Sequence, residues 1–140
     1  MRVLGLDVGS KTIGVAISDE FGWTAQALEV IQRKGMSRDI ERIKQLIKEY
    51  QVGDIIIGLP KNMNGKEGEQ AKKVQGFLEG LQTKVNLPIR TWDERLSTAM
   101  AEKTLLEGDL SRAKRKKIID KVAAQVILQG YLDSTGVHSQ

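Results

Sequence analysis

Acidic residues occur at three unusual places in this sequence. Asp7 lies within the apolar run of residues 2–8, Asp93 and Glu94 end a short strand-like run, and Asp120 lies in a helical pattern. A buried carboxylate without a partner is costly, so each place calls for a physical reason. Carboxylates that meet repel one another unless a cation lies among them. We therefore predict that Asp7, Glu94 and Asp120 hold a cation together.

The residue types of this cluster predict the ion. The chain has no cysteine, and its one histidine, His138, lies in a C-terminal tail of small polar residues. Oxygen ligands without nitrogen or sulfur favour Mg²⁺ or Mn²⁺. Such a site can hold two ions about 4 Å apart, which activate water and stabilise the leaving oxygen of a phosphodiester. The predicted chemistry is hydrolysis of a phosphodiester bond.

Each acid also has an ordinary explanation. Asp7 could accept backbone amides from the turn that follows it, and Glu94 could pair with Arg95 or with a lysine. Asp120 could pair with Lys116, four residues earlier, for a few tenths of a kcal/mol. The coincidence of three acids on one architecture favours the metal site.

The rest of the pattern predicts the elements that position the acids. The expected order is strands at 2–8, 12–18 and 25–32, a helix at 38–50 capped by Ser37, a strand at 52–59, a mobile loop at 61–68, a helix around 71–81, a strand at 89–93, a helix that begins at Ser97 and a helix at 117–133. Three antiparallel strands followed by βα units predict an α/β, ribonuclease H-like fold. We expect a mixed five-stranded sheet with helices on both faces.

This architecture can bring the acids to one end of the sheet. If the first and last strands are neighbours, Asp7 and Glu94 share that end. Asp120 lies about 20° from Ile127 around its helix, beside the apolar stripe. The choice between Asp93 and Glu94 stays open, because a one-residue shift in register exchanges their faces.

Basic residues precede the last predicted helix. Positive charge at a helix N-terminus opposes the helix dipole, so local stability does not explain the run. We predict that it binds a phosphate backbone; a solubilising face is the alternative. The predicted nucleic-acid-binding residues are Lys11, Arg95, Arg112, Lys114, Arg115, Lys116 and Lys117.

Length and composition predict one cytoplasmic domain. The chain has 140 residues and a net charge of +4, and it shows neither an apolar signal region nor a run of membrane-spanning length;. We expect a single domain at 1–134, a flexible tail at 135–140, no membrane partner, and a monomer or weak homodimer.

Four motifs resemble the YqgF/RuvX family. They are Asp7-Val-Gly-Ser-Lys-Thr-Ile-Gly-Val-Ala, Gly58-Leu59-Pro60, Asp93-Glu94-Arg95-Leu96-Ser97-Thr98 and Asp120-Lys121-Val122-Ala123-Ala124. The resemblance runs from residue 2 to about residue 132, in the family's order and spacing. It implies a ribonuclease H-like fold and identifies Asp7, Glu94 and Asp120 as catalytic acids of a metal-dependent nuclease.

The resemblance also implies candidate substrates. Members of the family are described as processing the 5′ end of pre-16S ribosomal RNA in ribosome biogenesis, and others are called Holliday junction resolvases. An RNA endonuclease is therefore the expected function, and a DNA junction resolvase of recombination and repair is the alternative. A non-catalytic RNA-binding assembly factor is a third reading. Actin-like ATPases and sugar kinases share the aspartate-glycine hairpin, but they need two such lobes.

Overall fold

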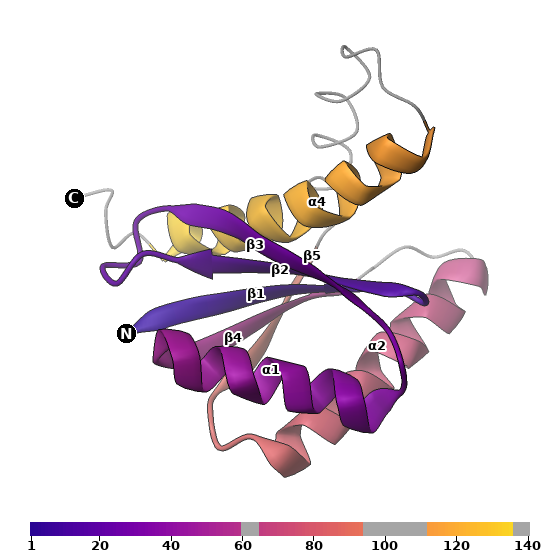
Figure 1. The fold of residues 1–140 in the computed structure, drawn as a ribbon, viewed down its shortest axis with the longest axis horizontal. Helices are drawn as coiled ribbons and strands as arrows, with labels where there is room; N and C mark the ends of the chain where they lie inside the picture. Colours follow the sequence, from indigo (N-terminus) through magenta and orange to yellow (C-terminus); the bar gives the residue numbers. More distant parts are fainter. Residues whose placement is uncertain (60–64, 94–111, 136–140) are drawn as a thin grey trace.

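The computed structural model describes residues 1–59, 65–93 and 112–135, which form a five-stranded sheet with helices on both faces (Figure 1). The strands are β1 (Arg2–Val8), β2 (Thr12–Ser18), β3 (Ala25–Gln32), β4 (Val52–Leu59) and β5 (Ile89–Asp93), in the order β3-β2-β1-β4-β5. β2 runs antiparallel to both of its neighbours, β1 and β3, whereas β4 runs parallel to β1 and β5 runs parallel to β4. The predicted mixed sheet is confirmed.

The expectation that the first and last strands are neighbours is wrong. β4 lies between β1 and β5. It takes this interior place because Ile55, Ile56 and Ile57 are apolar on both faces, and all three side chains are fully buried;. The ends of β1 and β5 are therefore two strand spacings apart, about 10 Å.

Helices cover the two faces unequally. α1 (Met36–Tyr50) and α2 (Gly65–Lys84) lie on one face, and α4 (Arg112–Ser134) crosses the other (Figure 1). Leu4, Leu6 and Val8 of β1 belong to the larger apolar cluster, beneath α1 and α2. A smaller cluster joins Ile56 of β4 to the apolar stripe of α4. Within the described ranges, no helix has the length and apolar character needed to cross a membrane.

α1 begins at Met36 with Gly35 as its N-cap, so the predicted cap at Ser37 is wrong. Gly35 has φ of 121°, a conformation that residues with a side chain rarely adopt;. The carboxylate of Asp39 accepts the backbone N–H of Lys34 at 3.0 Å, and no side chain caps the helix from the N-cap position. Asp39 lies in the first turn as predicted, where its charge complements the helix dipole;.

Two helices are longer than their apolar spacing predicted. α2 begins at Gly65, so residues 65–68 are helical and not part of a loop. α4 begins at Arg112, so the basic run forms the first turns of the helix instead of preceding it. Apolar spacing marks only the packed turns, whereas Lys, Arg, Glu and Ala extend a helix through their high intrinsic propensity. The predicted helix from Ser97, the remainder of the predicted loop at 61–64, and the tail from 136 lie outside the described residues.

Candidate functional site

Asp7 lies near the carboxyl end of β1, on the face that α4 covers. The neighbouring residues Leu6 and Val8 belong to the apolar cluster on the opposite face, so strand alternation turns Gly5 and Asp7 toward α4;. Gly5 shows how close α4 comes, because a Cβ at this position would lie 2.8 Å from the Cβ of Leu128. Asp7 itself is partly exposed.

Glycines flank Asp7 on both neighbouring strands. Asp7 pairs with Gly14 of β2, and the register that pairs Leu6 with Ile57 brings Gly58 of β4 beside Asp7. Neither glycine brings a side chain against the carboxylate. A buried sheet interior with two glycines beside one acid is typical of a place that another group must approach closely.

α4 runs antiparallel to β1. Near the end of α4, Leu132 lies by Gly22, in the turn between β2 and β3, and this turn is at the same end of the sheet as the start of β1. Ala124 and Leu128 lie against Gly5. Asp120 precedes Ala124 by four residues, about 6 Å along the helix axis. The helix therefore carries position 120 from Gly5 toward the carboxyl end of β1.

Two glutamines hold α4 in this register. The Gln129 side-chain oxygen accepts the backbone N–H of Ala25 at 2.9 Å, and the Gln125 amide donates to the Ala25 carbonyl at 3.1 Å. Both bonds anchor the helix to the first residue of β3, so the helix cannot slide along the sheet without breaking them. Gln125 and Gln129 are spaced i and i+4, which places them on one face of the helix, and this polar spacing was not considered in the prediction from apolar residues.

β5 reaches the same end of the sheet through β4. Gly58 pairs with Trp92, so Trp92 is level with Asp7 two strands away. Trp92 packs on the α4 face as expected for a core residue, with its ring edge-on to Tyr131 at 6.1 Å. Asp93 is the last residue of β5, and Glu94 lies outside the described residues.

The turn after Asp7 is held by Arg33, which the sequence did not single out. The Arg33 guanidinium donates to the carbonyl of Gly9 at 2.9 Å, and its backbone N–H donates to the carbonyl of Lys11 at 2.9 Å. Asp39 accepts from Arg33 Nε at 3.0 Å, and the guanidinium lies 5.5 Å from the ring centre of Phe77. One side chain thus joins the turn to α1 and α2.

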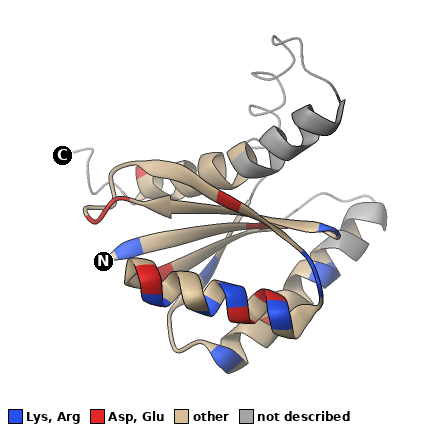
Figure 2. Ribbon diagram, viewed as in Figure 1, with Lys and Arg blue, Asp and Glu red and all other residues tan. Residues whose placement is uncertain are grey.

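The predicted phosphate-binding residues fall into three groups. Lys11 is exposed at the tip of the β1–β2 hairpin. The basic run from Arg112 to Lys117 lies on the first turns of α4, whose backbone alone is described there, and Arg95 lies outside the described residues. Lys and Arg also gather along the connection from β3 into α1 (Figure 2).

The carboxylates fit a hard divalent cation by their chemistry. Asp7 offers oxygen ligands beside two residues without side chains, and the predicted partners Glu94 and Asp120 would add only oxygen. Within the described residues, no three His, Cys, Asp or Glu side chains form a group that could hold a metal. Neither Glu94 nor the Asp120 side chain is among those residues.

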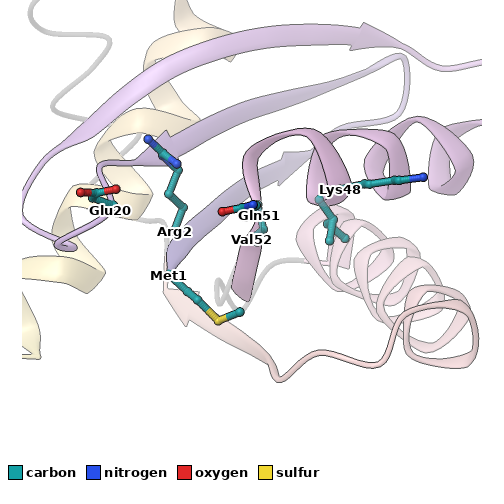
Figure 3. Close-up of a pocket in the computed structure, with 7 residues that line it drawn as sticks. Met1, Arg2, Glu20, Lys48, Gln51 and Val52 are labelled. Atoms are coloured by element: carbon teal, nitrogen blue, oxygen red, sulfur yellow. The ribbon is translucent and has the colours of Figure 1, made fainter.

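A pocket of about 490 Å³ lies at the opposite end of β1. Figure 3 shows its lining, which includes Met1, Arg2 and Glu20 beside the end of α1. Arg2 of the pocket lies five residues before Asp7 on β1, about 17 Å away, so the two do not form one site;.

Comparison with known proteins identifies the family. The RuvX family model, described as Holliday junction resolvase, matches residues 1–134. The chain belongs to the RuvX family. A relative from Desulforamulus reducens is 62% identical over 96% of this chain and 98% of its own length. One from Clostridium novyi is 59% identical over 96% of this chain and 99% of its own. Both are provisionally named pre-16S rRNA nucleases.

The fold of this RuvX family chain is similar to that of a solved Holliday junction resolvase. RuvC of T. thermophilus, solved with a Holliday junction substrate, aligns over 98% of this chain and 97% of its own, with a TM-score of 0.60 and 15% identity. The shared architecture confirms the ribonuclease H-like fold. At this identity the likeness concerns the fold alone.

Proposed function

We propose that this RuvX family chain is a metal-dependent endonuclease that processes the 5′ end of pre-16S rRNA. Family membership makes it an enzyme that hydrolyses phosphodiester bonds. The RNA substrate is supported by the relatives provisionally named for that reaction, which match nearly their whole length to this chain.

Asp7, Glu94 and Asp120 are the proposed catalytic acids. The observation that carries this proposal is the place of Asp7, on the α4 face between Gly14 and Gly58. From Gly5, Asp7 lies about 7 Å along β1, and position 120 lies about 6 Å along α4 from Ala124 in the same direction. These similar distances in one direction support the proposal that Asp120 approaches Asp7.

Strand alternation favours Glu94 over Asp93. Trp92 packs on the α4 face, the face of Asp7. Side chains two positions apart in a strand share a face, and this rule favours the residue two positions after Trp92 as the proposed ligand. The same argument supports a third ligand from β5 although β4 separates that strand from β1.

The protein's own residues would bind and orient the RNA. Asp7, Glu94 and Asp120 would hold Mg²⁺ or Mn²⁺, which supplies a water molecule of lowered pKa and stabilises charge on the phosphate. Lys11 at the hairpin tip would contact a phosphate close to the acids. Arg95 and the basic run from Arg112 to Lys117 would bind the backbone on the α4 side.

One experiment tests the proposal directly. The purified protein is incubated with a precursor 16S rRNA fragment and, in parallel, with a four-way DNA junction, with and without Mn²⁺. We expect Mn²⁺-dependent cleavage of the RNA, and a fall of at least about 100-fold in Asp7→Asn, the loss typical of a removed charge-stabilising group. The control is Asp54→Asn, the same change on β4 at an acid paired with Arg90.

The outcomes separate the candidate functions. Junction cleavage without RNA cleavage would assign the chain to the resolvases, which the family description also names. RNA binding without cleavage of either substrate would make it an assembly factor. Full RNA cleavage by a folded Asp7→Asn variant would remove Asp7 from the active site.

A further inference from the structure

A basic groove lies between β3 and α1, on the opposite face of the sheet from α4. It has a volume of about 310 Å³ and is lined by residues 29–32, by Lys34, and by Arg38, Asp39 and Arg42. β3 is the outer strand of the described sheet, so its backbone borders the groove. We propose that this groove, which we define by Lys34 and Arg38, binds the RNA backbone flanking the cleaved bond.

The acids of the groove are already neutralised. Glu29 forms two hydrogen bonds with the Arg42 guanidinium, at 2.6 and 2.9 Å. Asp39 is 1% exposed and pairs with Arg33 at 3.0 Å. These two pairs leave the groove with the uncompensated positive charge of its remaining cations.

Lys34 and Arg38 supply that charge. Both are exposed, and in the described part of the chain no carboxylate oxygen lies within 4 Å of either cationic group. Arg38 lies in the first turn of α1, where a positive charge opposes the helix dipole;. Helix stability therefore does not explain Arg38, whereas a bound anion would.

The groove lies at the same end of the sheet as Asp7. β3 runs parallel to β1, and Lys34 follows the carboxyl end of β3. Asp7 pairs with Gly14 and Gly14 pairs with Val30, so two strand spacings, about 10 Å, separate Asp7 from the strand that borders the groove;. Lys11 lies between them at the hairpin tip.

Charge and position together select the ligand. Exposed cations along an open groove, with no unpaired acid among the described lining residues, fit a polyanion whose phosphates repeat. A backbone passing the acids on the α4 side would cross the hairpin tip at Lys11 and enter this groove. The proposed path of the RNA from the acids to the groove rests on the proposed nuclease function, but the test of the groove requires only RNA binding.

The test compares two double variants of equal charge. Lys34→Ala/Arg38→Ala removes two cations from the groove, and Lys44→Ala/Lys48→Ala removes two exposed cations further along the same helix. Each is made in Asp7→Asn, so that a labelled single-stranded precursor rRNA fragment stays uncut. Affinity is measured by fluorescence anisotropy across a salt titration, and thermal unfolding verifies that both variants fold.

We expect the groove variant alone to lose affinity and salt dependence. Two lost phosphate contacts on single-stranded RNA should reduce the slope of log K against log salt by about 1.4. Equal slopes in the two double variants would overturn the proposal, and a β3 edge used by a peptide strand would give that result. If the wild-type protein cuts no RNA yet the slopes differ, the groove stands and the nuclease proposal fails. If the wild-type protein cuts RNA and the two slopes agree, the nuclease proposal stands and the groove proposal fails.

Discussion

Arg33 Nε lies 3.0 Å from Asp39 Oδ2, and this ion pair ties the turn after Asp7 to the start of α1. The Asp39 carboxylate is 1% exposed and also accepts the Lys34 backbone N–H. Arg33 in turn donates to the Gly9 carbonyl. Through one buried pair, the hairpin bearing the candidate acid is fixed to the helical layer.

We predict that Asp39→Asn destabilises the protein by about 3 kcal/mol, because it leaves Arg33 as a largely buried charge without its partner. Urea unfolding monitored by circular dichroism measures the change. Glu29→Gln is the matched control, since the Glu29–Arg42 pair joins β3 to the same helix but is more exposed. Its loss should cost less than about 1 kcal/mol. Equal losses in both variants would contradict the structural role of Asp39.

Gly5→Ala should destabilise the protein by about 1–3 kcal/mol, because the added methyl group would overlap Leu128 in a packed interior;. Since Leu128 lies on the helix that carries Asp120, we also expect lower RNA cleavage well below the unfolding temperature. Gly76→Ala, in open space on α2, provides the control. That change should stabilise by about 0.5–1 kcal/mol. A Gly5→Ala variant as stable and active as the wild type would contradict the close approach of α4.

Cleavage should stop in excess chelator and return on addition of Mg²⁺ or Mn²⁺, because carboxylates alone cannot offset the charge of the phosphate. Asp120→Asn should raise the Mn²⁺ concentration for half-maximal cleavage by at least about tenfold. Asp133→Asn, on the same helix near its other end, should leave that concentration unchanged. A rate that persists in chelator would exclude the metal mechanism.

Alanine at Lys114, Arg115, Lys116 and Lys117 should weaken RNA binding and reduce the salt slope by up to about 3, if each cation neutralises one phosphate of a single strand. The control replaces four exposed lysines elsewhere, Lys44, Lys48, Lys72 and Lys73, and so changes the net charge equally. Should both sets alter the slope alike, the basic run would serve solubility and not a specific contact.

The strands and their order along the chain could be predicted from local patterns. The apolar runs of β1 and β4 follow from the burial of both faces of each strand, and that requirement can be read from neighbouring residues in the sequence. Asp7 could likewise be proposed as a site residue from its place in an apolar run and from the short family motifs. Helix ends were predicted less well, since the polar turns of α2 and α4 carry no apolar period.

Only the tertiary structure decided which distant groups meet. The insertion of β4 between β1 and β5, the glycines at 14 and 58 beside Asp7, and the approach of Leu128 to Gly5 all depend on strand pairing and layer packing. The Arg33–Asp39 pair could not be predicted either, because an arginine in a connection is usually solvated. Only the fold brings a buried carboxylate and the Gly9 carbonyl beside it. Local sequence fixes what a segment must bury, but the partner that covers it comes from elsewhere in the chain.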